Sequence, residues 1–322
     1  MIIRDKTVIV FDIELFPNFF CCTLKETESN KNVILEISSR KNDIEKIIKF
    51  FHRITTKVKS RREIKDKYIF CGYNNIHYDN VIINYIIANR DELINKNYLQ
   101  ICEELSKLSD QIINSGEGVQ SWYKWKYLTY FDTLDLLTML FSQKLRVGLK
   151  SMQVTMQYPN VQEYDGNFNE FLPDSEIPNV LIYNINDVNS TTELLNRCKK
   201  DIELRLAIED EYNIDVLNKD GVNIGMQIIA QRYLEKTGLQ WKDIKDLRDP
   251  CDIIDLNKVI LPFIKFDTPL LQDILIELKK QKVLPGRKGY EKHFLLDNVE
   301  YTLGVGGIMY ASLYRNIKFK NR

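Results

Sequence analysis

Histidine and closely paired cysteines are scarce in this chain of 322 residues. It has three histidines, and none of its six cysteines belongs to a C-x-x-C pair. Because structural zinc sites are built from such clusters, the sequence predicts no zinc site. Cysteines that lie inside apolar stretches are typical of buried free thiols in a reducing compartment.

The chain also lacks an excess of either charge. Lys plus Arg and Asp plus Glu each number 45, so the formal net charge is zero. This balance argues against a protein that coats duplex DNA, because such proteins need a basic face. It permits an enzyme that holds only a few terminal nucleotides.

Long apolar runs are missing as well. No stretch reaches the roughly 18 apolar residues that a membrane span requires, and the polar residues 1–6 are unlike a signal peptide. We therefore expect a cytoplasmic protein with no membrane partner.

What is present is the composition and the periodicity of an α/β domain. Hydrophobic residues make up 44% and charged residues 28%, as in ordinary globular proteins. Residues 7–12, 19–24 and 33–38 have the apolar, β-rich composition of three consecutive strands, which predicts an antiparallel meander. Asn42 can then cap a helix with apolar side chains on one face, namely Ile44, Ile47, Ile48 and Phe51.

The pattern continues with alternating strands and helices. Residues 68–72 predict a strand, 80–88 a helix and 127–137 another apolar strand segment, and Asn179 can cap a long helix that continues to about residue 206. This β-β-β-α-β-α-β-α order predicts a ribonuclease-H-like fold, which is an α/β mixed sheet flanked by helices.

The character of the sequence changes near residue 210. Residues 224–234 predict a helix, and Thr268 and Pro269 open another as cap and first helical residue. A turn is expected at 285–286, and 301–307 is a glycine-rich strand end. We therefore predict two domains, 1–210 and 211–322, the second an α+β extension.

Two acidic residues mark the end of the first predicted strand. Asp12 and Glu14 are two residues apart, so both side chains point to the same face of the strand. Two adjacent carboxylates are costly unless a cation neutralises them. D-x-E is common by chance, and a strand end that has reached solvent explains it equally well on its own.

Two further polar motifs follow other predicted elements. Residues 75–79 (NIHYD) come after a strand, where Asp79 can be either a metal ligand or a cap for the next helix. Tyr183 and Asp187 are four residues apart, hence neighbours on one helix face. A phenol beside a carboxylate can orient water, although a Tyr packed on the core explains this pair as well.

In this fixed order, the three motifs resemble those of the DnaQ-like (DEDD) exonucleases, and in particular the proofreading domain of phage family-B DNA polymerases. Residues 11–18 (FDIELFPN) are similar to the first exonuclease motif. Residues 75–79 are similar to the second motif of the protein-primed type, with Tyr78 in place of the more usual Phe. Tyr183 and Asp187 match the tyrosine form of the third motif (DEDDy), and the resemblance covers about residues 5–205.

The resemblance implies a metal-dependent 3′→5′ exonuclease that degrades single-stranded DNA from its 3′ end to nucleoside 5′-monophosphates. It implies that two Mg²⁺ or Mn²⁺ ions are held by four carboxylates, those of Asp12, Glu14, Asp79 and Asp187. Tyr183 would orient the attacking water. The residues expected to contact substrate are Asn75, Tyr78, Lys150 and Phe16, with Lys144 and Arg146 as alternatives to Lys150 and with a place in the core as the alternative for Phe16. Lys150 lies in residues 148–151 (GLKS), which are similar to a loop of that family.

Residues 211–322 resemble the connecting region that precedes the palm of such polymerases, and the chain carries no Asp-Thr-Asp motif of a palm. A palm-containing chain is therefore an expected partner, and the resemblance implies the cytoplasm of a phage-infected bacterium. Two alternatives remain. One is an RNA-trimming exonuclease of the same fold. The other is a non-catalytic accessory N-terminal subunit of a split phage polymerase that holds the primer strand. The aromatic residues within 122–130 fit either base stacking or packing at a strand edge.

Overall fold

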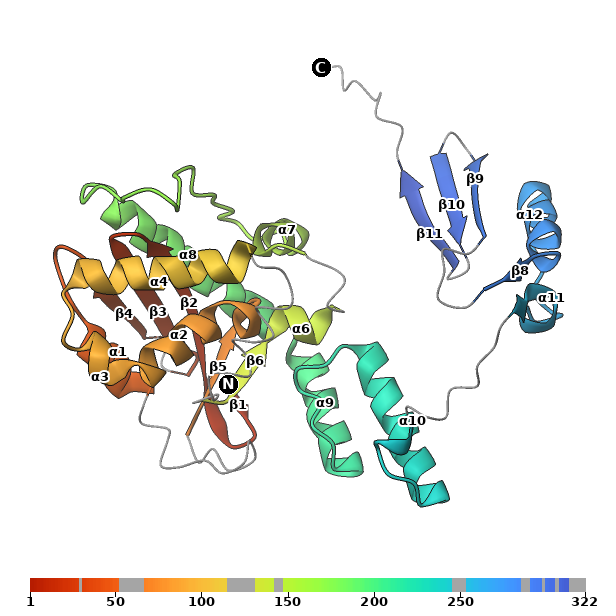
Figure 1. Ribbon diagram of the computed structural model, residues 1–322, viewed down its shortest axis with the longest axis horizontal. Coiled ribbons are helices and arrows are strands. Elements are labelled where there is room, and N and C mark those ends of the chain that lie inside the picture. The colour runs from red at the N-terminus through yellow and green to blue at the C-terminus, as the bar shows by residue number, and fades with distance from the viewer. Residues whose placement is uncertain are drawn as a thin grey trace. The chain divides into compact units, whose positions relative to one another are not determined.

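The computed structural model describes residues 1–28, 31–51, 67–114, 131–141, 147–244, 253–284, 290–296, 299–304 and 307–312. The chain divides into two compact units, Met1–Lys236 and Thr237–Arg322 (Figure 1). The predicted boundary at residue 210 falls inside the first unit. The aromatic residues within 122–130, Lys144, Arg146 and the turn at 285–286 lie outside the described residues.

A mixed β-sheet forms the centre of the first unit. The predicted meander is confirmed as β2 (Lys6–Phe16), β3 (Phe19–Glu26) and β4 (Asn32–Ile37), which pair antiparallel. On the other side of β2, β5 (Tyr68–Gly72) and β6 (Thr133–Asp135) add in parallel. The order is β4-β3-β2-β5-β6, with the short β1 (Ile2–Ile3) also paired to β2.

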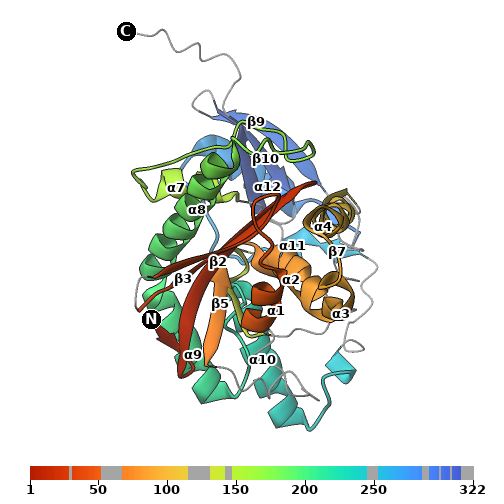
Figure 2. The ribbon, with the colours of Figure 1, turned by 90° about the vertical axis from the view of Figure 1, so that its left-hand side faces the viewer.

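Helices cover both faces of this sheet, as Figure 2 shows. The odd-numbered apolar residues of β2 (Ile9, Phe11, Ile13 and Leu15) share a core with α1 (Ile44–Phe51), α2 (Asp79–Ala88) and α4 (Tyr98–Asn114). The even-numbered Val8 and Val10 face α8 (Ile177–Arg197). The α/β fold class, a mixed sheet flanked by helices as in ribonuclease-H-like proteins, is therefore confirmed.

Further helices belong to the described part of the first unit. They are α3 (Arg90–Leu93), α6 (Leu136–Leu140), α7 (Leu149–Thr155), α9 (Lys199–Tyr212) and α10 (Gly221–Thr237). Asn42 caps α1 as predicted, because its Oδ1 accepts a hydrogen bond from the Ile44 amide at 3.2 Å.

Three predicted boundaries were wrong. β2 continues past Asp12 to Phe16, because β3 pairs with it along that whole length. The long helix predicted beyond Asn179 is two helices, α8 and α9, which break at Cys198. Leu194, Cys198 and Ile202 pack in one core on both sides of the break, so the apolar period continues through it. Residues 149–151, which we expected in a loop, begin α7.

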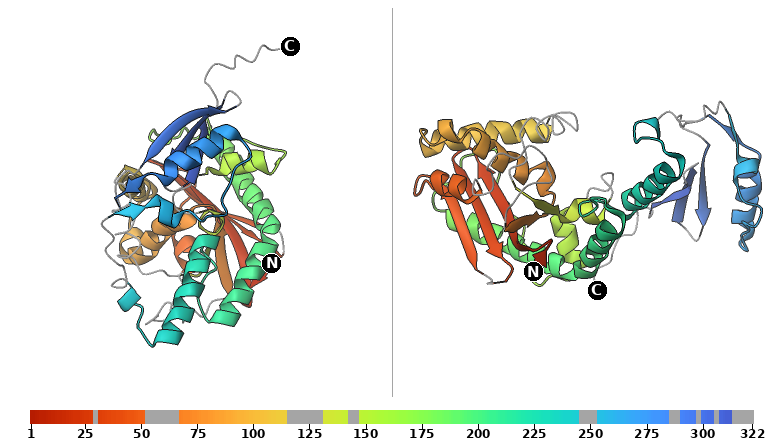
Figure 3. Two further views of the ribbon diagram at one scale, coloured as in Figure 1. Left: turned by 90° about the vertical axis from the view of Figure 1, so that its right-hand side faces the viewer. Right: turned by 90° about the horizontal axis from the view of Figure 1, so that it is seen from below.

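The second unit is smaller. β7 (Ile254–Asp255) pairs with β8 (Lys282–Val283), and α11 (Leu256–Val259) and α12 (Pro269–Lys279) lie between them in sequence. A three-stranded antiparallel sheet follows, formed by β9 (Glu291–Leu296), β10 (Val299–Gly304) and β11 (Gly307–Ser312). Figure 3 shows this sheet and α12 from two further sides. Glu277 of α12 accepts a hydrogen bond from Tyr290 at 2.7 Å and pairs with Lys292 of β9.

The described cysteines are buried, as their apolar surroundings predicted. Cys21, Cys22, Cys71, Cys102 and Cys198 are buried free thiols. Among the helices in the described part of the chain, none is both long and apolar enough to cross a membrane.

Candidate functional site

The first part of the site is the open edge of β2. β5 pairs with β2 only up to Val10, whereas β3 pairs with it up to Phe16. Asp12 and Glu14 therefore lie on the stretch of β2 that has lost its parallel neighbour. Both point to the same face as Val8 and Val10, which is the face covered by α8.

α8 brings the third motif to this face. Asp187 is buried on α8, and one oxygen from each of the carboxylates Asp12, Glu14 and Asp187 lies within 4.8 Å of the others. Tyr183 lies one helical turn before Asp187 and is half-buried. Residues more than 170 positions apart in the sequence thus converge, as the motif order predicted.

Asp79 lies beside this cluster rather than within the group of three. It is the first residue of α2 and is buried, and its Oδ1 accepts a hydrogen bond from the Ile13 amide at 3.2 Å. This bond occupies the edge of β2 between Asp12 and Glu14, where β5 no longer pairs. The structure therefore places Asp79 next to the other carboxylates. Tyr78, not Asp79, occupies the capping position of α2, and no side chain makes a capping bond there.

The turn before Asp79 is held by groups that sequence reasoning did not identify. Asn74 adopts a left-handed conformation with φ 63°. The buried Asp135 carboxylate accepts hydrogen bonds from the amides of Asn74 (3.2 Å) and Ile76 (3.0 Å). A Cβ on Gly72 would lie 2.7 Å from that of Asn75, so this position requires glycine. The backbone between β5 and α2 is therefore fixed by the hydrogen bonds to Asp135 and by the close contact at Gly72.

The carboxylates are electrostatically strained in the absence of a cation. Burial, followed by the charge of Asp79, raises the pKa of Asp12 well above its usual range. Burial and the charge of Asp187 raise the pKa of Glu14 in the same way. Burial raises the pKa of Asp79 to about 7, even though hydrogen bonds from backbone amides oppose the shift. Clustered buried carboxylates that resist ionisation are characteristic of functional sites.

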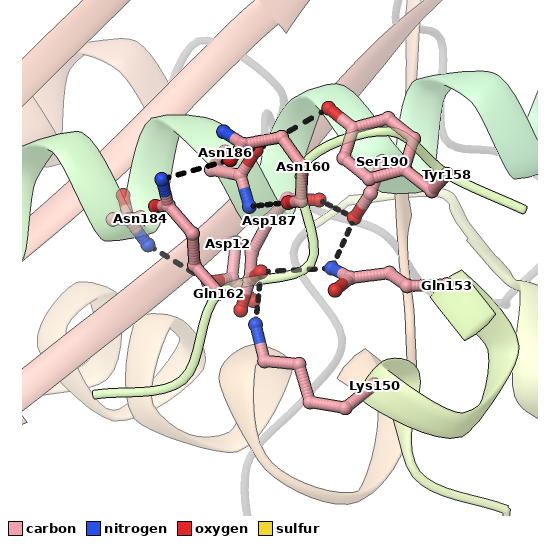
Figure 4. A network of polar contacts seen from close by, with 10 residues as sticks. All are labelled: Asp12, Lys150, Gln153, Tyr158, Asn160, Gln162, Asn184, Asn186, Asp187 and Ser190. Atoms are coloured by element: carbon pink, nitrogen blue, oxygen red, sulfur yellow. Dashed lines mark hydrogen bonds and ion pairs between the residues drawn. The ribbon is translucent and has the colours of Figure 1, made fainter. Parts of the chain in front are cut away.

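A second layer of polar side chains orients these carboxylates, as Figure 4 shows. Asn184 donates from Nδ2 to Asp12 Oδ2 at 2.7 Å, and Gln153 donates from Nε2 to Asp187 Oδ1 at 3.0 Å. Both side chains are fully buried. Sequence reasoning missed them; for Asn184 the available signal was its position four residues after Val180 and four before Val188, which are both buried.

Lys150 brings a cation into contact with the cluster. Its Nζ lies 2.5 Å from Asp187 Oδ1 and 4.3 Å from the centre of the Tyr183 ring. Its side chain is 23% exposed, so the ammonium group can reach a ligand that enters from solvent. The sequence expectation that Lys150 belongs to the site thus fits its position, although its present partner is a carboxylate.

The other expected substrate contacts lie deeper. Phe16 is 1% exposed and packs edge-on against Phe19, and Asn75 is fully buried. Tyr78 is half-buried, and its hydroxyl shares a hydrogen bond of 2.8 Å with Ser109. Direct contact of Phe16 or Asn75 with a substrate does not fit this burial. Phe16 instead stacks with Phe168, and Asn75 donates a hydrogen bond to Thr133 Oγ1 at 2.9 Å.

The donor set of this site fits a divalent cation. Asp12, Glu14 and Asp187 offer only carboxylate oxygens, which are the ligands preferred by Mg²⁺ and Mn²⁺. The neighbouring negative charges disfavour ionisation of Asp12 and Glu14, and a bound cation would offset that penalty. The structure therefore contains an acidic triad that could bind a metal ion.

Comparisons of the chain with models of protein families, with curated proteins and with solved structures find no match. The site itself must therefore support any assignment of function.

Proposed function

We propose that this protein is a metal-dependent 3′→5′ exonuclease of the DEDDy type, acting on single-stranded DNA. The observation that supports it best is the convergence of Asp12, Glu14 and Asp187, with Asp79 and Tyr183 adjacent, from three distant parts of the chain. We further propose that the four carboxylates hold two Mg²⁺ or Mn²⁺ ions, and that residues 211–322 connect to a polymerase palm.

Each side chain has a distinct part in the proposed hydrolysis. When bound, the two cations would activate water and stabilise the leaving oxygen of the phosphodiester. Asp12, Glu14 and Asp187 would hold them, and Asp79 would hold the second through its other oxygen, since its Oδ1 is bonded to the Ile13 amide. Lys150 would exchange Asp187 for a phosphate oxygen. Asn184 and Gln153 keep two of the carboxylates in a fixed orientation.

Tyr183 would position the attacking water. Burial and the charge of Asp187 raise the pKa of its hydroxyl, so it stays protonated throughout the neutral range and can hydrogen-bond a water without ionising. Tyr183→Phe is expected to lower kcat by about 100-fold and to leave the affinity for DNA nearly unchanged. Single-turnover rates and oligonucleotide binding measure the two effects separately. Equal losses in rate and affinity would contradict an orienting role.

A gel assay with 5′-labelled single-stranded DNA tests the function as a whole. The full chain with Mg²⁺ or Mn²⁺ is expected to give a ladder that shortens from the 3′ end, because an exonuclease removes one nucleotide at a time. EDTA and the double variant Asp12→Ala/Glu14→Ala are expected to abolish it. Glu193→Gln on the exposed side of α8 serves as the matched control and should digest like the wild type.

The other outcomes of this assay separate the alternatives. A labelled RNA of the same sequence that is digested faster than DNA would favour RNA trimming. No digestion of either strand by the folded protein would contradict the exonuclease. Co-purification with a palm-containing chain would then favour the accessory role.

A further inference from the structure

The segment between α7 and α8 is firmly held although it contains neither helix nor strand. Near its start, Asn160 donates from Nδ2 to Asn186 Oδ1 at 3.0 Å, and Asn186 Nδ2 returns a bond to the Asn160 carbonyl at 2.9 Å (Figure 4). Near its end, both the amide and the carbonyl of Leu172 bond to the Asn18 side chain, at 2.8 and 2.9 Å. The segment is therefore fixed to α8 at one end and to the turn after β2 at the other.

Between these two anchors the segment carries two aromatic rings that extend the site. The Tyr164 ring centre is 6.1 Å from that of Tyr183 and 5.3 Å from that of Phe168. Phe168 stacks on Phe16, with ring centres 4.8 Å apart and planes at 26°. Phe16 is buried whereas Phe168 is 38% exposed. A row of rings thus leads from Tyr183 to the surface, with Phe16 beneath it.

The position of Tyr164 is also determined by the backbone around it. A Cβ on Gly166 would lie 2.4 Å from Cε1 of Tyr164, so the chain at Gly166 packs closely against the hydroxyl end of that ring. The charge of Glu14 contributes to the raised pKa of Tyr164, after burial and Glu176, which places the phenol within electrostatic reach of the acidic triad. Rings that are held in place lose little conformational entropy when a ligand stacks on them.

We propose that Tyr164 and Phe168 form a stacking surface for the bases of the single strand whose 3′ end enters the acidic site. This inference rests on the proposed function and identifies which side chains bind the bases of the substrate. Stacking on an uncharged ring accepts any base, and it suits a protein whose net charge of zero gives no bulk attraction for the nucleic-acid backbone. Phe16 acts through Phe168, as a positioning residue below the ring that meets the base.

Binding of a labelled thymidine oligonucleotide tests this surface without requiring hydrolysis. The full chain carrying Asp12→Asn is used with Mg²⁺, so that digestion does not interfere, and Kd is measured by fluorescence anisotropy. Phe168→Leu keeps an apolar side chain over Phe16 but removes the flat ring, and it is expected to weaken binding about tenfold. Phe171→Leu is the control, since this ring is 60% exposed on the same segment but outside the row.

Abasic substitution then identifies the group that stacks. An oligonucleotide lacking one base is made for each of the four 3′-terminal positions. At one or two positions the missing base should weaken binding about tenfold in the parent protein and hardly at all when Phe168→Leu is also present. In the wild-type background, Phe168→Leu should raise KM by the same factor and leave kcat unchanged.

The outcomes distinguish this inference from the proposed function. An unchanged Kd for Phe168→Leu, a loss as large for Phe171→Leu, or an abasic penalty that persists without the ring would overturn the stacking surface, whether or not the wild type digests DNA. Base-dependent binding through Phe168 by a protein that digests nothing would support the surface and overturn the exonuclease.

Discussion

Asp12→Asn is expected to lower the rate of 3′-end hydrolysis by about 10³- to 10⁴-fold and, without metal, to raise the melting temperature. The loss of rate follows because one ligand charge disappears from the triad, and cation stabilisation of such a reaction amounts to several kcal/mol. The gain in stability follows because Asp12 is a desolvated carboxylate next to Asp79 and Glu14. The amide oxygen of Asn can still accept the bond from Asn184.

The two effects are measured on the same preparation. Rates come from single-turnover digestion with saturating Mg²⁺, and melting temperatures from calorimetry in EDTA at pH 7.5. Removing one buried charge worth about 1–2 kcal/mol should raise the melting temperature by roughly 3–6 °C. Glu193→Gln is the matched control, because it removes an exposed charge from α8. A variant that is both inactive and less stable would indicate a structural role for Asp12 instead of a metal-binding one.

Much of the fold could be predicted because its strands and helices have strong apolar patterns. β2 to β5 and the helices α1 and α2 follow from runs and periods of apolar residues. The break between α8 and α9 could not be predicted, because the same core receives Leu194 before it and Ile202 after it. Apolar periodicity indicates which helix face is buried, but it does not indicate where the helix axis changes direction.

The carboxylates of the site could be predicted because the spacing within each motif determines which side chains share a face. Asp12 and Glu14 share a strand face, and Tyr183 and Asp187 share a helix face, so each pair is oriented by local structure alone. The three carboxylates converge only because β5 stops pairing at Val10 and α8 crosses the same face. That depends on the sheet topology, which a two-residue motif does not encode.

The positions of the residues around the carboxylates could not be predicted from the sequence. Phe16 lies within the first motif, two residues after Glu14, so the sequence allowed both substrate contact and a place in the core. It lies in the core, and Phe168 stacks on it. Tyr164 and Phe168 lie in a segment without periodicity, so no pattern marked them. Their position depends on side-chain bonds from Asn18 and Asn186, which are long-range contacts.

Without metal, the protein is expected to lose stability as the pH rises from about 4 to about 7, and added Mg²⁺ or Mn²⁺ should remove that loss. Burial raises the folded-state pKa of Asp79 to about 7 from an unfolded value near 3.8, and the pKa values of Asp12 and Glu14 are raised in the same direction. The folded protein therefore binds more protons than the unfolded chain in this range. Its stabilising effect is complete below pH 4 and is lost as the pH passes the folded pKa.

The expected loss of stability can be calculated from the raised pKa of Asp79 alone. A shift of about three pKa units corresponds to roughly 4 kcal/mol, which is about 8–16 °C in melting temperature for a unit of this size. Calorimetry in EDTA between pH 5 and 8 should show this decrease, and saturating Mg²⁺ should flatten it. Asp79→Asn should reduce the slope, while Glu193→Gln should leave it unchanged. A melting temperature that is flat or rises over this range without metal would mean that the carboxylates do not share a desolvated site.

Metal binding near pH 6.5 should also release protons, since each ligand must be ionised to bind.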